Sequence, residues 1–442
     1  MKENVLSKQY SPMALIRFAM PNIIMMIFMS LYTIIDGMFI SRLVSTIALS
    51  SVNMAYPLSS VQLGIGIMIG TGGSAVIAKK MGEQKNEEAR QCFTCLVAFT
   101  IGLSLLVMTL CLVFLKPILL FLGTSAIQMP DCLVYSKILM SFTPMLFLQV
   151  IFQSYFVTAG KPKLGLWVIV LGGVANVILD YLFMGVFGWG IAGAAMATGI
   201  GYSIPAVIAI VYFFKNKSQS LYFVSFHWDG GMLAKACING SSEMISNVAI
   251  AITTFLFNLI FMYYWKEEGV ASITIVQYYQ FVFSSIFIGF SLGIAPIISY
   301  KYGAKDYQQL HSITKFCIMF VSGCALMAYF ISIVTIEQSL MIFTQDPKVF
   351  EIVTGGFSIF ALSFILMGLS VFASGFFTAL NDGLVSGIIS FSRTFFFLIG
   401  CMILFPFWFG STGVWWAVPV AEFFGVIISI CFLIGKRKKY GY

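Results

Sequence analysis

The sequence predicts an all-α integral membrane protein in which twelve transmembrane helices form two pseudo-symmetric lobes of six helices. Three observations lead to this fold class. Of the 442 residues, 60% are hydrophobic and only 10% are charged, whereas about 25% of the residues of a typical soluble domain are charged. Apolar runs of about 20 residues or more, enough to cross about 30 Å of hydrocarbon as helices, follow one another along the chain. Motifs of the first half also return in the second half at a nearly constant spacing.

The apolar runs divide the chain into twelve predicted spans, and no polar stretch between them is long enough to bury a core of its own. The first two spans are long enough to tilt or bend, and they contain Pro21 and Pro57. The predicted spans are residues 14–40, 47–78, 92–115, 133–157, 164–187, 191–214, 238–264, 270–299, 312–335, 351–378, 384–408 and 413–435.

The positively charged residues are distributed unequally between the two sides that these spans define. Alternating loops place nineteen of the 25 Lys and Arg residues on one side and five on the other, and leave Arg393 inside a span. The larger set includes Lys2, Lys8 and the terminal run 436–439. By the positive-inside rule this side is cytoplasmic, so both termini are expected in the cytoplasm. The same rule accounts for the net charge of +8, and we therefore expect no nucleic-acid partner.

An internal repeat relates the two halves of the chain. The matching segments are IAKKMGEQ (77–84) with ISYKYGAK (298–305), FVTA (156–159) with FFTA (376–379), and FGWGIAGAAMA (187–197) with FWFGSTGVWWA (407–417), at offsets of 221, 220 and 220 positions. Since each half holds six spans, an even number, the halves are expected to be parallel repeats, an architecture that transporters use with the substrate path between the repeats. The predicted parts are an N-lobe (residues 1–214, helices 1–6), a cytoplasmic linker (215–235) and a C-lobe (236–442, helices 7–12).

Two acidic residues of the first half, Asp36 and Asp180, are predicted at membrane depth, where insertion scales give a cost of about 3 kcal/mol for an aspartate. Counted at 1.5 Å per residue, both lie roughly 8–11 Å below the outer boundary, at the level of Thr198. Asn176 precedes Asp180 by four residues and shares its helix face. Two carboxylates cannot both ionise cheaply in a desolvated site. We therefore expect a site that binds and releases a proton or Na⁺, for which Asn176 and Thr198 supply further oxygen ligands.

Glu243 and Glu422 are candidates for a second site in the second half. Glu243, in NGSSEMIS (239–246), is predicted in the first turns of its span, where it would either complement the helix dipole or bind a second ion. Glu422 is expected either to form an internal salt bridge with Arg393 or to take a functional part.

The sequence gives no indication of an enzyme. Only two histidines are present, His227 in the linker and His311 in a loop, and no HExxH motif, Cys/His cluster or phosphate-binding glycine-rich loop occurs. We therefore expect no cofactor apart from the coupling ion. Without a nucleotide site, the energy for transport would come from an ion gradient.

Several of these segments resemble the multidrug and toxic compound extrusion (MATE) family, in particular its bacterial branch, over essentially the whole chain. They are FAMPNIIMMIFMSLYTIIDGMFIS around Pro21 and Asp36, the loop AKKMGEQ, and NVILDYLFMGVFGWGIAGAAMAT (176–198). The resemblance implies a cation-coupled antiporter in the cell membrane, in a bacterium the inner membrane. Its partners would be lipophilic, often cationic drugs or toxins, the coupling cation and the lipid bilayer, with no obligate protein partner.

The resemblance also implies roles for particular residues. The positions that match Asp36, Asn176, Asp180 and Thr198 form the coupling site in the family. The proline that matches Pro21 bends the first helix when this site binds or releases the ion. Some members have a C-lobe site in which a glutamate that would match Glu243 is partnered by an acid of the tenth span. Here the tenth span, GGFSIFALSFILMGLSVFASGFF, contains no acid. This departure favours the N-lobe site.

The predicted mechanism is alternating access, in which ion binding from outside at Asp36 and Asp180 competes with the drug and favours its outward release. A flippase for lipids or lipid-linked saccharides from the same superfamily is an alternative, although such proteins more usually have extra spans and cationic side chains in the cavity. An intramembrane enzyme or a channel is a second alternative, which the duplication and the absence of a catalytic motif disfavour. The coupling ion, the substrate and the oligomeric state stay open.

Overall fold

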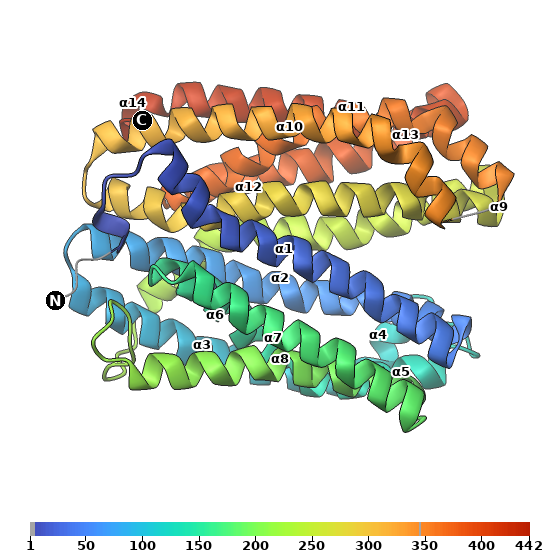
Figure 1. The fold of residues 1–442 in the computed structure, drawn as a ribbon, viewed down its shortest axis with the longest axis horizontal. Coiled ribbons are helices and arrows are strands. Elements are labelled where there is room, and N and C mark those ends of the chain that lie inside the picture. The colour runs from blue at the N-terminus through green and yellow to red at the C-terminus, as the bar shows by residue number, and fades with distance from the viewer. Residues whose placement is uncertain (1–4, 344–345) are drawn as a thin grey trace.

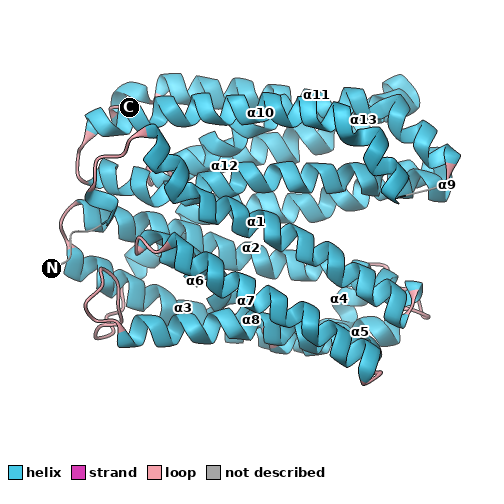
Figure 2. Cartoon of the chain, in the orientation of Figure 1, coloured by secondary structure: helices cyan, strands magenta, loops and turns pink. Residues whose placement is uncertain are grey.

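The computed structural model describes residues 5–343 and 346–442, and in this part of the chain the regular structure is helical throughout (Figure 1, Figure 2). Lys2 and the first four residues of the predicted N-lobe lie outside the described residues. The helices of the first half, drawn in blue to green, lie on one side of the molecule, and those of the second half, drawn in yellow-green to red, lie on the other (Figure 1).

The first half contains eight helices and the second half six, counted over the described residues. They are α1 (Pro12–Phe39), α2 (Thr46–Gly82), α3 (Asn86–Val113), α4 (Leu115–Phe121), α5 (Met129–Ser141), α6 (Thr143–Thr158), α7 (Pro162–Asp180), α8 (Gly190–Lys215), α9 (Gly230–Gly303), α10 (Tyr307–Phe343), α11 (Pro347–Ala379), α12 (Gly383–Phe391), α13 (Gly400–Gly435) and α14 (Arg437–Tyr440). A short 3₁₀ turn (Val5–Ser7) precedes α1, and π-helical segments follow α1 (Ile40–Val44), α7 (Tyr181–Val186) and α12 (Ser392–Ile399).

Ten helices among the described residues are long and apolar enough to cross a membrane, and the bent pair α5 and α6 would make eleven. The chain is therefore a multi-pass membrane protein, as its composition predicts, whereas the predicted number of twelve spans is not reached by this criterion. The difference lies in the stretch Gly383–Gly435, which runs on as one apolar unit. At Gly410, between the two spans predicted there, the backbone leaves helical geometry with a φ of +61°, a conformation that glycine adopts without steric cost.

Two further breaks divide the helices. The long helix α9 is interrupted at Lys266, whose φ is +54°, between the predicted seventh and eighth spans. The fourth predicted span, in contrast, is bent by 54° between α5 and α6. Pro144 stands in the first turn of α6 and has no N–H to donate, so α5 cannot continue through it. Pro21 and Pro57 lie inside α1 and α2 without ending them.

The two halves meet in a seam where α2 packs along α9, and one contact in this seam is reciprocal. A methyl group added at Gly82 would lie 2.1 Å from the carbonyl oxygen of Tyr300, and one added at Gly303 would lie 2.2 Å from that of Lys79. The offset of 221 found in the sequence carries residue 82 onto 303 and residue 79 onto 300. Equivalent residues of the two repeats thus contact each other symmetrically, as they do around a two-fold axis. Only glycine permits this close approach of the two backbones.

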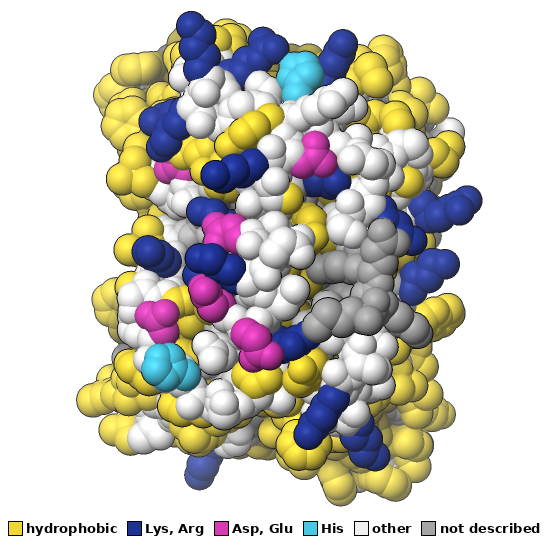
Figure 3. Space-filling model, turned by 90° about the vertical axis from the view of Figure 1, so that its left-hand side faces the viewer, with side chains coloured by type: hydrophobic (Ala, Val, Ile, Leu, Met, Phe, Trp, Pro, Cys, Tyr) yellow, Lys and Arg dark blue, Asp and Glu magenta, His cyan; other side chains and the backbone are white. Residues whose placement is uncertain are grey.

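One end of the molecule is rich in Lys and Arg, and we call it the basic end (Figure 3). The first described residues and the C-terminus both lie at this end (Figure 1). The loop between α2 and α3, with Lys79, Lys80 and Lys85, belongs to it as well, because it meets the end of α9 through the Gly82–Gly303 contact. The cytoplasmic position of this end stays a prediction.

The connection between the halves is packed against α3. It runs from Asn216 to Asp229, and α9 already begins at Gly230, so the last residues of the predicted linker are helical. Leu221 is fully buried, and the backbone N–H of Val224 donates to Oγ1 of Thr94 at 3.1 Å. The guanidinium of Arg90 lies 4.4 Å from the ring centroid of Tyr222. The connection is therefore a fixed part of the first half.

Candidate functional site

The structure brings Asp36 and Asp180 together, in the half of the bundle away from the basic end. Asp180 is the last residue of α7 and is 0% exposed, and Asp36 lies in the last turn of α1. Their carboxyl groups are close enough to interact electrostatically, and no hydrogen bond is formed between them. Among the described residues, no N–H or O–H group donates to either oxygen of Asp180 or to Oδ1 of Asp36. Two acids thus face each other with no cationic or neutral donor to satisfy them.

Both aspartates stand next to a departure from regular α-helix. The π-helical segment Tyr181–Val186 begins directly after Asp180, and the segment Ile40–Val44 begins one turn after Asp36. A π-turn is wider than an α-turn and is found mostly at functional sites. The wide turns shift the following residues relative to the α-helical register.

Asn176 is buried beside Asp180, and neither atom of its amide has a hydrogen-bond partner among the described residues. It lies one turn before Asp180 on the same face of α7, as the sequence predicts. The neighbouring helix α8 approaches closely because Gly201 faces Asn176, where an added methyl group would lie 3.0 Å from the Asn176 Cβ. Thr198, also on α8, is 8% exposed and donates its hydroxyl proton to the carbonyl oxygen of Ala194 at 3.0 Å. Its oxygen lone pairs stay available.

Sequence reasoning missed three tyrosines near the acid pair. Tyr32 on α1, Tyr135 on α5 and Tyr202 on α8 all interact electrostatically with Asp36. Tyr32 lies four residues before Asp36, a spacing that could have revealed it. Tyr135 and Tyr202 come from distant parts of the chain, and no sequence spacing links them to the acids. Their hydroxyl groups are donors that could orient a bound ion or water.

This arrangement can bind a proton or a small hard cation. A buried polar group without a partner costs about 1–3 kcal/mol, and an isolated buried charge costs more. A proton shared between the carboxyl groups removes most of this cost, and so does a cation bound by carboxylate, amide and hydroxyl oxygens. Among the described residues no group of three His, Cys, Asp or Glu side chains could hold a metal ion.

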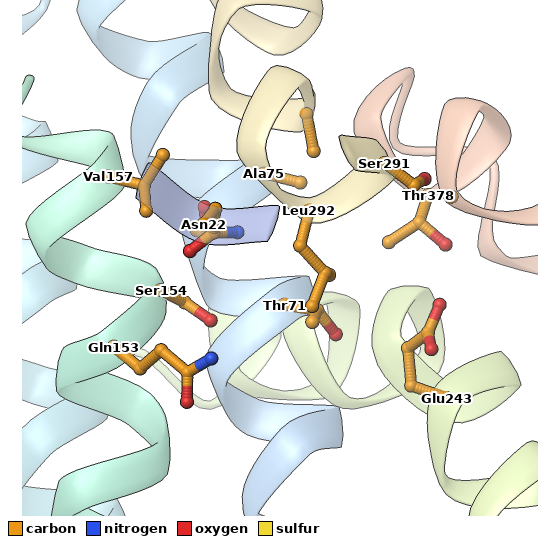
Figure 4. Close-up of a pocket in the computed structure, with 13 residues that line it drawn as sticks. Asn22, Thr71, Ala75, Gln153, Ser154, Val157, Glu243, Ser291, Leu292 and Thr378 are labelled. Atoms are coloured by element: carbon orange, nitrogen blue, oxygen red, sulfur yellow. The ribbon is translucent and has the colours of Figure 1, made fainter. Parts of the chain in front are cut away.

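A separate polar cavity lies between the two halves, nearer the basic end (Figure 4). Side chains from α1, α2, α6, α9 and α11 line it, and Glu243 is the one charged residue among the described residues of its lining. The other polar lining residues include Asn22, Thr71, Gln153, Ser291 and Thr378. The cavity thus joins both halves around the Glu243 carboxylate.

The structure corrects the predicted position of Glu243. The sequence places Glu243 in the first turns of its helix, but α9 begins at Gly230, thirteen residues earlier, and is capped by Asp229, whose Oδ1 accepts from the N–H of Met232 at 2.9 Å. Glu243 is therefore too far from the helix terminus to complement the dipole, which acts within the first turn. The reason is that α9 extends beyond the apolar stretch that defines the predicted span.

Glu422 does not share the cavity with Glu243. It lies on α13, is 6% exposed, and forms an ion pair with Arg393, whose Nη1 is 3.4 Å from Oε1 of Glu422. The stem of Arg393 packs against Gly425, where an added methyl group would lie 2.9 Å from the Arg393 Cγ. The salt bridge considered for Glu422 is confirmed. Arg393 also interacts electrostatically with Glu243, so the two candidates for a second site share this cation although only Glu243 lines the cavity.

These features define a polytopic helical membrane protein of two related halves, with the acids Asp36 and Asp180 close together in the first half. The sequence model of the MatE family matches residues 21–182 and 244–403, which is more than half of the chain. The chain belongs to the MatE family, and the resemblance of its motifs to that family is confirmed. The two matched segments begin 223 positions apart (244 − 21) and end 221 positions apart (403 − 182), close to the offset of the internal repeat.

Known proteins similar to this chain agree with the family assignment. The chain is 24% identical over 415 residues to the multidrug export protein MepA of Staphylococcus aureus (strain MSSA476), an alignment that covers 92% of this chain and 90% of MepA. Its fold is similar to the outward-facing conformation of a multidrug resistance MATE family transporter of the MOP superfamily, with a TM-score of 0.91, 19% identity and coverage of 99% and 98% of the two chains. The structure of the MATE multidrug transporter DinF-BH gives a TM-score of 0.92 at 23% identity, with both chains covered completely (100%).

Proposed function

We propose that this protein is a cation-coupled antiporter that exports lipophilic, often cationic, small molecules by alternating access. Its membership of the MatE family supports a transporter rather than an enzyme, and the names of its relatives, which describe multidrug export, support the class of substrate. The coupling ion is a proton or Na⁺.

The observation that carries this proposal is the pair Asp36 and Asp180: Asp180 is fully buried, Asp36 is partly buried, and both oxygens of Asp180 and Oδ1 of Asp36 have no hydrogen-bond partner among the described residues. Such a pair is stable only while it holds a proton or a cation, so its loading state can be tied to the conformation of the protein. We place the coupling site at these two aspartates, with Asn176 and Thr198 as additional oxygen ligands when the ion is Na⁺.

In the proposed cycle the N-lobe (1–214) and the C-lobe (236–442) move relative to each other, and the basic end faces the cytoplasm. Contacts between the halves run from the basic end to the middle of the bundle. There the hydroxyl oxygens of Ser30 and Ser285 are 2.6 Å apart, and Ser60 donates to the carbonyl oxygen of Asn247 at 3.0 Å. This arrangement is closed toward the cytoplasm. Ion binding from outside would then release the substrate outward, before the lobes rock to the opposite arrangement.

Pro21 is the proposed bending point of α1 during this change. It is followed by Asn22, whose Nδ2 donates to the carbonyl oxygen of Gly289 across the seam at 3.3 Å. Because proline cannot donate the hydrogen bond that would hold the helix straight, a bend at this position costs little. Bending there would change the contact of α1 with α9 and the position of Asp36 together.

Export of a fluorescent lipophilic cation from inverted vesicles tests the proposal. The parent protein, Asp180→Asn and the control Asp131→Asn, an aspartate in the first turn of α5, are compared under a pH gradient and then under a Na⁺ gradient. We expect the parent and the control to transport under one gradient, which identifies the ion, and Asp180→Asn to lose about 100-fold of the coupled rate, the size of effect typical when a key ionisable group is removed. If Asp180→Asn transports at the parental rate, the coupling role is wrong. If the parent responds to neither gradient, lipids and lipid-linked saccharides become the substrates to test.

A further inference from the structure

The N-terminal segment Val5–Tyr10 lies across the basic end, where it contacts both halves of the molecule. Val5–Ser7 form a 3₁₀ turn, and the side chain of Leu6 is 0% exposed. A terminal segment of this length is ordinarily a solvated tail unless it is tied down. The complete burial of Leu6 and the contacts described below show that this one is packed into the protein.

On the second half, the segment is held by the loop between α9 and α10. Lys301, only 2% exposed, donates from Nζ to the carbonyl oxygen of Ser7 at 3.3 Å and forms an ion pair with Asp306 at 3.0 Å. The backbone N–H of Tyr10 donates to Oε1 of Gln309 at 3.1 Å. Lys301, at the end of α9, and Gln309, at the start of α10, therefore hold the segment, and Asp306 in the loop between these helices pairs with Lys301.

On the first half, the segment packs against the turn between α6 and α7. Gly160 has a φ of +71°, and a methyl group added there would lie 2.9 Å from the Cβ of Val5. The hydroxyl of Tyr10 donates to the carbonyl oxygen of Val5 at 2.8 Å, and the Tyr10 ring meets the Phe18 ring of α1 edge-on at 6.0 Å. The segment thus forms an internal hydrogen bond, packs against the first half and is hydrogen-bonded to the second half.

The loop that holds the segment is also the place where the halves meet. Gly303, two residues beyond Lys301, makes the symmetric backbone contact with Lys79 described above. Any movement that opens the seam at the basic end must carry the Lys301–Gln309 loop away from the first half. It must therefore break the bonds from Lys301 and Gln309 to the segment, or pull the segment away from Gly160.

We propose that residues 5–10 form a strap that locks the basic end in its closed arrangement and is released when this end opens. The inference rests on the proposed alternating access. The strap adds a buried leucine and two hydrogen bonds to the closed state only, and these contacts shift the conformational equilibrium toward that state.

Distance measurements between the halves test the strap in the full-length protein in lipid nanodiscs. Nitroxide labels are attached to Lys163→Cys in the first half and His311→Cys in the second, both at exposed positions, after the nine native cysteines are replaced. Double electron–electron resonance then gives the fractions with short and long distances. The strap variants are Leu6→Ser and Gln309→Ala, and the matched control is Met13→Ser, which makes a similar change at a side chain that is 66% exposed.

We expect Leu6→Ser to raise the ratio of long to short distances by about tenfold, and Gln309→Ala by roughly fivefold, since a buried leucine stabilises more than one hydrogen bond. Met13→Ser should leave the ratio unchanged. The strap is wrong if both strap variants keep the parental distribution. The parent protein tests alternating access separately. If the distances in the parent change with neither pH nor Na⁺, alternating access is wrong, whatever the strap variants show.

Discussion

The two halves of this protein share a repeat but differ in how they treat polar groups at membrane depth. The offset of 221 carries Asp36 onto Phe257, and the offset of 220 carries Asp180 onto Gly400 and Asn176 onto Phe396, so the second half has no counterpart of the acidic pair. Its own charged residues, Arg393 and Glu422, correspond to Gly173 and Tyr202. The acids of the first half therefore lie in its first and fifth predicted spans, whereas Arg393 and Glu422 lie in the fifth and sixth predicted spans of the second half, and Glu243 lies in the first.

The difference also concerns hydrogen-bond partners. In the first half both oxygens of Asp180 and the whole amide of Asn176 have no partner among the described residues. In the second half Ser386 bonds to Ser242 at 2.8 Å and to Thr378 at 2.7 Å, a network of hydroxyl groups that satisfy one another. Polar groups that satisfy each other hold membrane helices together. The described residues of the second half also contain unpartnered buried atoms, among them Oδ1 of Asn239 and Oε2 of Glu422. We propose a stabilising role for the hydroxyl network of the second half and ion coupling for the unpartnered groups around Asp180.

The largest effect on stability is expected for Arg393→Leu, which tests the structural half of this comparison. The substitution leaves Glu422 buried without its cation, and breaking a buried pair in this way costs about 3–5 kcal/mol. The double change of Arg393→Leu with Glu422→Leu should recover most of that loss. Thermal unfolding in detergent measures both. Equal unfolding temperatures for the parent and Arg393→Leu would show that the pair has no structural role.

A smaller effect is expected at the symmetric glycines, which test whether the repeats are equivalent at the seam. Gly82→Ala and Gly303→Ala each place a methyl group against a backbone carbonyl oxygen of the other half, at 2.1 Å and 2.2 Å. Both should reduce transport by about tenfold and by similar factors, because closure of the basic end is hindered equally. Gly102→Ala, where the methyl group meets nothing within 4 Å, is the control. Clearly unequal reductions in transport would show that Gly82 and Gly303 are not equivalent at the seam.

The smallest effect is expected at the loops that hold Lys80 and Lys301, which are equivalent by the offset of 221. Lys80 pairs with the half-exposed Glu88, whereas the buried Lys301 pairs with Asp306. Burial of Asp306 opposes its ionisation, but hydrogen bonds from Lys301 and the N–H of Gln309 outweigh this and hold its pKa below the ordinary value of 3.8. Because the pKa of Asp306 is lower in the folded protein, its ionised form stabilises the folded state. This contribution to the free energy of unfolding is complete above pH 3.8 and is lost as the pH falls through the lowered pKa.

The difference in unfolding temperature between the parent and Asp306→Asn should therefore be constant from about pH 8 to pH 5 and disappear in stronger acid. Glu88→Gln is the comparison, because an exposed ion pair contributes little. A difference that grows as the pH falls would contradict the sign derived for Asp306.

Much of the fold and part of the candidate site could be predicted from the sequence. The regular rise of a helix allowed Asp36 and Asp180 to be placed at one level by counting from the ends of their spans. The same counting failed for Glu243, because α9 continues past the apolar stretch through polar residues such as Lys235. Hydrophobicity marks where a helix enters hydrocarbon, and the helix itself can begin earlier.

Other features depend on contacts that a single sequence does not reveal. Tyr135 and Tyr202 come near the acids only because α8 packs beside α7 and α5 packs beside α8. The strap was also missed, since Leu6 stands in a short polar segment that has the composition of a tail. The break between α5 and α6 has a local cause in Pro144, but its angle is set by packing.

The most direct test of the central claim is ion binding by the purified protein. Binding of radioactive Na⁺, and release of protons when a lipophilic cation is added, are measured for the parent, Asp180→Asn and Glu422→Gln, which keeps a hydrogen-bond acceptor for Arg393. The account predicts that one of the two signals is present in the parent and in Glu422→Gln and absent in Asp180→Asn. A signal that persists in Asp180→Asn, or that is lost only in Glu422→Gln, would contradict the assignment of ion coupling to the first half.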